Sequence, residues 1–265
     1  MTRGALIFAF NNETTDYVSL AAWSAGNIRR HLGIPVAVVT DQSDASGFDK
    51  VIVTQTAAQN RRYFPDYDQA VTWHNMNRVT AYELTPWDHT LVLDADYVVA
   101  SDQLAQLFDV RSDFLAHRWA KDVSDCNDFR GLNWFGQHRM PQWWATVMLF
   151  KKSRTASMIF DCMNMIRDHW QHYRDLYCIS KSTYRNDYAL SIALMTVNGH
   201  VPYDGEIPWQ LMSVMPQHGL TQTAKDQYRL DFTDTQNRAK WITLADQDFH
   251  AMGKRDLGVI VGNPS

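Results

Sequence analysis

The sequence predicts an α/β fold, with a mostly parallel mixed sheet flanked by helices, in a single domain spanning residues 1–265. Two observations lead to this prediction. Short apolar runs of strand length alternate with patterns of helical period through the first hundred residues. One of these runs, residues 90–93, is uninterrupted by charge and then ends abruptly in Asp94 and Asp96. A strand that is apolar throughout is typical of a parallel sheet covered on both faces.

The first half of the chain alternates strand and helix. Residues 5–10, 35–40 and 50–53 are expected to form buried strands because they are bulky and partly β-branched. Between the first two, Asp16 is expected to cap a helix that Gly33 stops. A further helix is expected at 71–84, before the strand that ends at Asp94. This βαβαβ order predicts helices on both faces of the sheet.

The second half is less regular. We expect a short helix after Ser101, a strand at 114–116 and then a long stretch, 118–144, without a clear period. A strand at 145–150 and a helix from the cap residue Ser153 towards residue 170 follow. A helix at 187–197 closes at Asn198 and Gly199, and the last strand is expected at 241–244.

Cysteine content, net charge and the motifs that are absent exclude several classes of protein. The three cysteines form neither a disulfide framework nor a zinc signature, and no leader or membrane-spanning run is visible, so we expect a soluble, cytoplasmic, reduced protein. The net charge of −4 gives no bulk attraction to nucleic acid or to an anionic membrane. No glycine-rich phosphate loop occurs, which disfavours kinases and dehydrogenases.

The two acids after the central strand are the main candidate for chemistry. A buried strand cannot also bury two unpaired carboxylates, so Asp94 and Asp96 are expected at its carboxyl end, where open α/β sheets bind ligands. Two hard oxygen ligands suit Mg²⁺ or Mn²⁺, which often bridge carboxylates to a substrate diphosphate. The alternative is a strand that simply ends in a polar turn.

A late run of residues adds to this candidate site. His250, Gly253 and Lys254 offer an imidazole ligand, a place for close backbone approach and a cation within five positions. An imidazole can complete a carboxylate site for Mn²⁺. The alternative is a surface turn that contains these residues by chance.

Taken together, these motifs resemble the GT-A glycosyltransferases, of the glycogenin and lipopolysaccharide-galactosyltransferase kind, from about residue 5 to residue 254. The late motif is one residue shorter than the family's and lacks the Pro-Trp that often follows it. The resemblance implies a Rossmann-like GT-A fold, with a nucleotide-binding half at 1–100 and an acceptor and sugar half at 101–265. It also implies Mn²⁺ or Mg²⁺ held by Asp94, Asp96 and His250, a UDP-sugar donor, and transfer with retention.

The resemblance also assigns roles to single residues. The residues that it implies for donor binding are Phe10, Asn11, Asn12, Tyr17, Asp41, Arg78, Ala95, Gly253 and Lys254. Asp187 resembles the acid of a later Asp-Gln element that contacts the sugar, and is expected to be catalytic together with Asp94 and Asp96. Tyr188 replaces the usual Gln. From the residues alone, Asp187 could be only a helix cap, and Arg78 only a solvated helix residue.

The acceptor is expected at 118–144, where four basic residues alternate with six aromatic ones. Aromatic rings stack on sugars and on unstacked bases, while Arg pairs with phosphate. The opening of the chain, at residues 11–17 and 27–36, looks like that of phage-encoded DNA-modifying glycosyltransferases. That resemblance implies a hydroxymethylated base (hydroxymethylcytosine) in phage DNA as acceptor, a UDP-pentose or UDP-hexose donor, and action in the host cytoplasm.

Two alternatives to this acceptor stay open at the level of sequence. One is a transferase that acts on a polysaccharide or glycolipid, and the other is an inactive module that only binds nucleotide sugars. The aromatic residues of 118–144 could also form no more than a partly buried lid.

Overall fold

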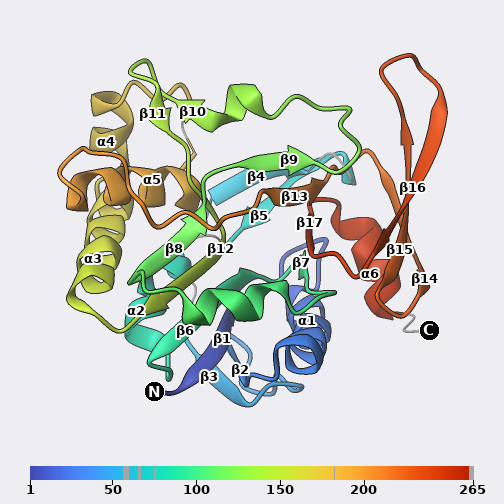
Figure 1. The fold of residues 1–265 in the computed structure, drawn as a ribbon, viewed down its shortest axis with the longest axis horizontal. Helices are drawn as coiled ribbons and strands as arrows, with labels where there is room; N and C mark the ends of the chain where they lie inside the picture. The colour runs from blue at the N-terminus through green and yellow to red at the C-terminus, as the bar shows by residue number, and fades with distance from the viewer. Residues whose placement is uncertain (56–59, 65–66, 75, 182, 263–265) are drawn as a thin grey trace.

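A computed structural model describes residues 1–55, 60–64, 67–74, 76–181 and 183–262. Its centre is a six-stranded sheet in the order β3-β2-β1-β6-β12-β8 (Figure 1). In chain order these strands are β1 (Arg3–Phe8), β2 (Val36–Thr40), β3 (Lys50–Val53), β6 (His89–Asp94), β8 (Phe114–His117) and β12 (Trp144–Lys151). The first four strands pair in parallel, whereas β12 runs antiparallel to both β6 and β8. The predicted α/β class, with a mostly parallel mixed sheet flanked by helices, is confirmed.

Helices cover both faces of this sheet because its strands are apolar on both sides. Leu91 and Leu93 of β6 pack in one core cluster with α1 (Tyr17–Leu32). Val92 packs on the other face with α3 (Arg154–Asp168) and α5 (Asn186–Val197). The Asp16 side chain accepts a hydrogen bond from the Ser19 N–H at the start of α1, and Gly33 ends that helix in the left-handed conformation. Both predicted ends of α1 are confirmed.

A second, four-stranded sheet joins distant parts of the chain in the order β7-β17-β13-β9. Its strands are β7 (Tyr97–Val98), β9 (Ala120–Asp122), β13 (Leu211–Val214) and β17 (Phe249–Ala251). β17 pairs antiparallel with β7, which places His250 opposite Tyr97, and the Ala251 N–H donates to the Asp96 carbonyl oxygen at 3.0 Å. This pairing fixes the late part of the chain beside the two acids.

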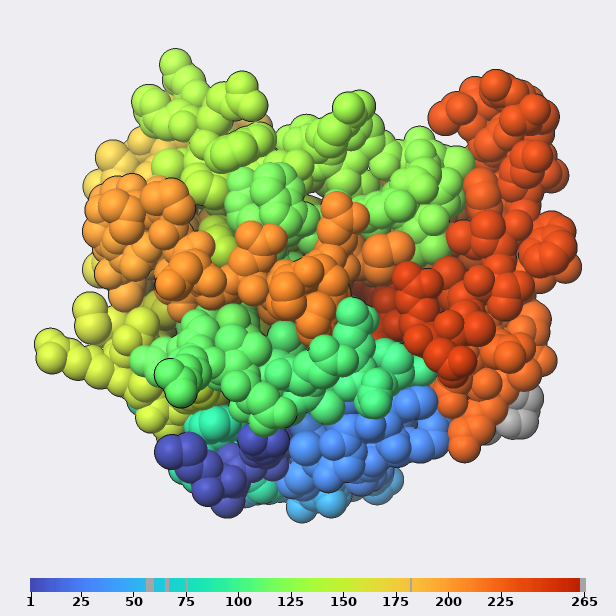
Figure 2. Space-filling view, in the orientation of Figure 1, coloured from blue at the N-terminus to red at the C-terminus, as the bar shows by residue number. Residues whose placement is uncertain are grey.

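The remaining elements are short or lie at the edges of the molecule. They are the hairpin β4 (Asn60–Phe64) and β5 (Gln69–Trp73), η2 (Asn77–Thr80), α2 (Ala81–Leu84), η3 (Gln103–Asp109), η4 (Arg130–Asn133), β10 (Trp134–Phe135), β11 (Met140–Pro141), α4 (Trp170–Leu176) and α6 (Lys254–Gly262). Near the C-terminus β14 (Gly219–Ala224), β15 (Gln227–Thr233) and β16 (Ala239–Ala245) form an antiparallel meander. Part of it stands out from one side of the molecule (Figures 1 and 2).

Two predictions about local structure are wrong in part. The helix expected at 71–84 begins only at Asn77, because residues 69–73 form β5 and pair with β4. The stretch 118–144 is not free of secondary structure, since it contains β9, η4, β10 and β11. The predicted strand at 241–244 is confirmed within β16, but its partner β15, and β14 beyond it, were not predicted. No helix in the described part of the chain has the length and apolar character that crossing a bilayer requires.

Candidate active site

A cleft opens where the parallel strands end. Phe8 ends β1 and Asp94 ends β6, and both residues line the cleft. Its volume of about 170 Å³ is far more than one water molecule needs, so it can admit a ligand. The other lining residues are Phe10, Tyr17, Arg62, Phe64, Trp73, His74, Arg78, Ala95, Asp96, Trp144, Ala145, Thr146, Arg185, Asn186, Asp187, Ser213, Pro216, His250, Met252 and Lys254.

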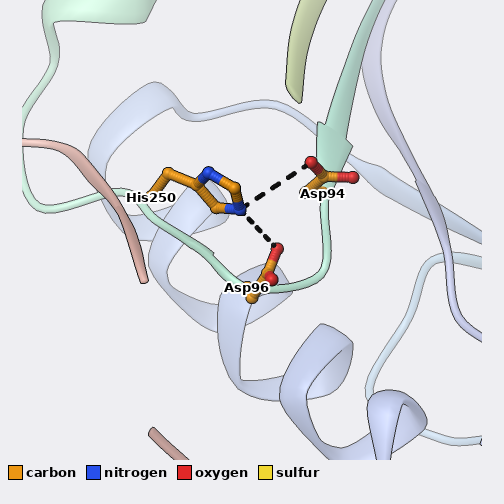
Figure 3. A group of neighbouring side chains, drawn as sticks. All are labelled: Asp94, Asp96 and His250. Atoms are coloured by element: carbon orange, nitrogen blue, oxygen red, sulfur yellow. Dashed lines mark ion pairs between the residues drawn. The ribbon is translucent and has the colours of Figure 1, made fainter. Parts of the chain in front are cut away.

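Asp94, Asp96 and His250 meet on one side of this cleft (Figure 3). The imidazole Nε2 of His250 lies 3.4 Å from Asp96 Oδ1 and 4.0 Å from Asp94 Oδ2. The first two residues come from the end of β6 and the turn after it, and the third comes from β17. The structure therefore brings together the three residues that were expected to bind metal.

Each of the two acids also pairs with a cation. The Arg78 guanidinium donates to Asp94 Oδ1, and donates to the Ala145 carbonyl oxygen at 2.7 Å. The Lys254 ammonium pairs with Asp96 Oδ2 and donates to the Ala251 and Met252 carbonyl oxygens, each at 3.0 Å. Each carboxylate thus turns one oxygen to a cation and the other to His250.

This arrangement keeps Asp96 charged although it is buried. Burial by itself would raise the pKa of the Asp96 carboxyl, but the positive charge of Lys254 and the contact with His250 outweigh burial and hold this pKa below its ordinary value. Arg78 is also buried, so its charge lies in the site and not on a solvated helix surface.

The donor set fits a divalent metal. One carboxylate oxygen from each acid and the imidazole nitrogen all lie within 4.8 Å of one another. Two carboxylates and one imidazole suit Mn²⁺, while Mg²⁺ prefers oxygen ligands alone. These three residues could hold the ion on the cleft side and leave the remaining positions to a substrate.

Asp187 lines the same cleft and is held by two partners. Its Oδ1 accepts from the Ala145 N–H at 3.0 Å, and its Oδ2 accepts from Arg185 Nη2 at 2.8 Å. Asp187 is not the cap of α5, because Arg185 occupies that position and makes no side-chain cap bond. The Nε of Arg185 is buried and has no hydrogen-bond partner among the described residues.

Aromatic rings form the end of the cleft near β1. Phe10 and His74 lie with their ring centroids 6.1 Å apart, and Tyr17 lines the cleft beside them. Burial raises the pKa of the Tyr17 phenol well above its ordinary value, so this side chain remains a neutral donor. His74 Nδ1 has no hydrogen-bond partner within the described ranges.

Four residues expected at the donor site do not line the cleft. Asn11 Oδ1 accepts from the Val18 N–H at 2.9 Å, and Asn12 Oδ1 accepts from the Thr15 N–H at 2.9 Å. These bonds fix the turn before α1 and direct both side chains into it. Asp41 is exposed beyond the end of β2, and Gly253 lines a separate cavity next to α6.

Trp73, His74 and Arg185 line the cleft but were not expected there from the sequence, whereas Trp144 was expected at the acceptor site. Arg185 directly precedes the Asn186-Asp187 pair, and this position was the only sequence signal for it. Trp73 and His74 lie in a segment that was expected to be helical. They reach the cleft because Trp73 ends the strand β5 and His74 follows it directly.

The predicted acceptor segment 118–144 is only partly available to a ligand. Arg118 is buried, lies 4.4 Å and 4.8 Å from the ring centroids of Trp119 and Trp134, and donates to the Gln142 carbonyl oxygen at 3.0 Å. It therefore holds the segment together and is not free to pair with phosphate. The two tryptophans remain 38% and 40% exposed, and Arg130 pairs with Asp128 at the surface.

No protein-family model and no curated protein matches the chain. Among solved structures, the galactosyltransferase LgtC bound to donor and acceptor sugar analogues is 15% identical, with a TM-score of 0.46, over 71% of this chain and 69% of its own. An active-site mutant of LgtC is 13% identical, with a TM-score of 0.49, over 77% of this chain and 71% of its own. The apo-form glycosyltransferase GlyE from Streptococcus pneumoniae TIGR4 is 14% identical, with a TM-score of 0.40, over 74% of this chain.

The aligned part covers 44% of GlyE, so this chain matches less than half the length of that protein. Identities and TM-scores of this size assign no family to the chain. The function proposed below therefore rests on the geometry of the cleft.

Proposed function

We propose that this protein is a metal-dependent glycosyltransferase that moves a sugar from a UDP-sugar to a hydroxyl acceptor. One observation carries the proposal: Asp94, Asp96 and His250 converge with two fixed cations, Arg78 and Lys254, in a cleft at the carboxyl ends of parallel strands. Metal ligands next to cations suit a diphosphate that must leave as an anion.

Different residues of the cleft would bind the metal ion and stabilise the diphosphate. Asp94, Asp96 and His250 would hold Mn²⁺, or Mg²⁺ in its place, and the ion when bound would supply Lewis-acid stabilisation of the leaving diphosphate. Arg78 and Lys254 add fixed positive charge on the same side, at no cost in reorganisation during the reaction. Because both cations are anchored to backbone carbonyl oxygens, their positions do not depend on the substrate.

The uridine base is proposed to lie against Phe10, Tyr17 and His74. These aromatic side chains form an apolar end of the cleft, and His74 Nδ1, which has no partner among the described residues, offers one polar contact. A ligand that binds only the folded state raises the melting temperature. UDP with Mn²⁺ should therefore raise it more than ADP or GDP does, and equal shifts would remove the uridine assignment.

Asp187 is proposed to position the sugar, and transfer is proposed to retain the anomeric configuration. Both Asp187 oxygens already accept hydrogen bonds, from Ala145 and Arg185, which argues against a free carboxylate base of the kind that inversion needs. The anomeric configuration of the product, read by NMR, tests this assignment.

The acceptor is proposed to be DNA that carries hydroxymethylated bases, with a polysaccharide or glycolipid as the second candidate. The exposed faces of Trp119 and Trp134 support either, because such rings stack on bases and on sugars. Arg139 lies 5.7 Å from the Trp134 ring and, with Lys121 and Arg130, would provide phosphate contacts. Replacing these three cations by Ala should make binding to DNA less dependent on salt.

A donor and acceptor screen read by mass spectrometry tests the proposal as a whole. Purified protein with Mn²⁺ is offered UDP-sugars together with hydroxymethylated DNA or simple glycans, and we expect a mass increase on one class of acceptor. Asp94→Asn should abolish the transfer, whereas the surface variant Asp175→Asn should not change it. An inactive binding module would bind UDP but neither transfer nor hydrolyse any sugar.

A further inference from the structure

The charges that line the cleft do not balance. Among the described residues, its walls contain three aspartates and four cationic side chains from Lys and Arg. Three of these cations are each paired with one acid: Arg78 with Asp94, Lys254 with Asp96, and Arg185 with Asp187. The fourth cation is Arg62, and no carboxylate of the described residues lies within ion-pair distance of it.

Arg62 is held towards the cleft by the aromatic side of its own hairpin. Its guanidinium lies 4.8 Å from the ring centroid of Trp73 and 5.8 Å from that of Phe64, and both rings also line the cleft. Along β4 the neighbouring Arg61 points to the other face, where it is exposed and donates to the Ala70 carbonyl oxygen. The hairpin is tied to the body of the protein by Glu13, which accepts from the Thr72 N–H at 2.8 Å.

Arg62 lines the same cleft as Asp96, Asp187 and Arg185, and the charges of these residues act on it. Burial lowers the pKa of the Arg62 guanidinium, the charge of Arg185 lowers it further, and the charges of Asp187 and Asp96 act in the opposite direction. A partly desolvated cation without a counter-ion is unfavourable, so such a residue is usually matched by an anion when its site is filled. Guanidinium is well suited to this because it binds carboxylate and phosphate with two parallel hydrogen bonds.

The anion cannot be the diphosphate alone if the proposed function holds. A divalent ion on Asp94, Asp96 and His250 would balance the doubly charged diphosphate of a nucleotide sugar, and the three acid–cation pairs already balance one another. Arg62 would then be the one excess charge in the described lining of the filled cleft. We propose that Arg62 selects a substrate with an additional anionic group, a carboxylate or a phosphate, which is carried either by the donor sugar or by the acceptor sugar.

The proposal rests on the proposed function, and binding measurements separate the two. Calorimetry with Mn²⁺ compares UDP, UDP-glucose and UDP-glucuronate on the wild type, on Arg62→Gln, and on Arg61→Gln as the matched control from the outer face of the same strand. A second arm saturates the protein with UDP and Mn²⁺ and follows the binding of glucose, glucuronate and glucose 6-phosphate by NMR.

We expect the wild type to prefer an anionic over a neutral ligand by about tenfold or more in one of the two arms, since a hydrogen bond to a charged group has that order of strength. Arg62→Gln should lose this preference and still bind UDP as the wild type does, while Arg61→Gln keeps the preference. A preference in the first arm puts the anion on the donor sugar, and one in the second arm alone puts it on the acceptor.

Two results would overturn the inference: no preference in either arm, or an Arg62→Gln variant that loses affinity for UDP, UDP-glucose and UDP-glucuronate equally. The second result would make Arg62 a diphosphate contact. If the wild type does not bind UDP with Mn²⁺ at all, the proposed function itself fails, and that outcome differs from both.

Discussion

At the scale of single residues, the cleft is dominated by charges that stabilise one another away from water. Asp96 and Lys254 are both buried, with 6% and 8% of their surfaces exposed. Each would be costly to bury alone, and the pair is acceptable because the ammonium also donates to two backbone carbonyl oxygens. The two residues are therefore part of the fold as well as of the site.

This gives a prediction about stability. Asp96→Asn should lower the free energy of unfolding by about 3 kcal/mol, because removing one partner leaves a buried charge without compensation. The matched control is Asp128→Asn, whose exposed pair with Arg130 is screened by solvent and should contribute little to stability. Urea denaturation measures both values. Equal, small effects for the two variants would show that Lys254 does not depend on Asp96.

A second prediction concerns His117, which is fully buried in the core at the end of β8. Burial lowers the pKa of its imidazole from 6.5 to about 4, although its bond to the Trp209 carbonyl oxygen acts in the other direction. The folded state thus binds a proton less readily than the unfolded chain. The free energy of unfolding therefore keeps its full value above about pH 6.5 and decreases as the pH falls towards 4, because the unfolded chain then gains a proton that the folded state does not.

At pH 4.5 this effect should remove about 2 to 3 kcal/mol of stability relative to pH 7. His117→Asn cannot gain the proton and should therefore lose that much less between the two pH values, as measured by denaturant unfolding. His200→Asn, at an exposed position, is the control and should follow the wild type. If His117→Asn has the same pH dependence as the wild type, the buried imidazole is not a source of acid sensitivity.

At the scale of elements, long apolar strands and periodic helices could be predicted from the sequence, and short pairings could not. β6 and α1 have patterns long enough to show their period, and both are found where expected. β7 and β17 have two and three residues, too few for a period, yet their pairing brings His250 to the acids. The structure places Asp94, Asp96 and His250 together, while their role as metal ligands stays a prediction.

The hairpin β4–β5 shows a second reason why part of the fold could not be predicted from the sequence. Residues 71–84 have apolar spacings that also fit a helix, but β5 is stabilised by pairing with β4 and by Glu13, which lies far away in the sequence. Such tertiary contacts override local propensity. As a result the hairpin that carries Arg62 and Trp73 into the cleft could not be placed from local patterns alone.

Gly136 offers a test of the segment 118–144. It has φ +67°, and an added Cβ would collide with the Tyr177 carbonyl oxygen at the end of α4. Gly136→Ala should therefore destabilise the protein by about 2 kcal/mol, through strain and displaced backbone. Gly131→Ala, with nothing within 4 Å of the added atom, should change stability by no more than about 0.5 kcal/mol. Equal melting temperatures for the two variants would mean that the segment does not pack on α4.

At the scale of the whole molecule, net charge gives little information about the site. The chain carries −4 overall, yet cations outnumber acids among the residues that line its cleft. The fold gathers these cations from distant parts of the chain, since the hairpin β4–β5 contributes Arg62 and the start of α6 contributes Lys254. Figure 1 shows how far apart in sequence these parts are, with the C-terminal segments lying beside the middle of the chain.

The proposed function requires that Asp94, Asp96 and His250 hold a divalent ion to which a nucleotide diphosphate binds. The most direct measurement is a calorimetric titration of chelator-treated protein with UDP, with and without Mn²⁺. We expect Mn²⁺ to tighten UDP binding by at least about tenfold in the wild type and to have no such effect on Asp94→Asn. UDP binding that is equally tight with and without Mn²⁺, or unchanged by Asp94→Asn, would contradict the account.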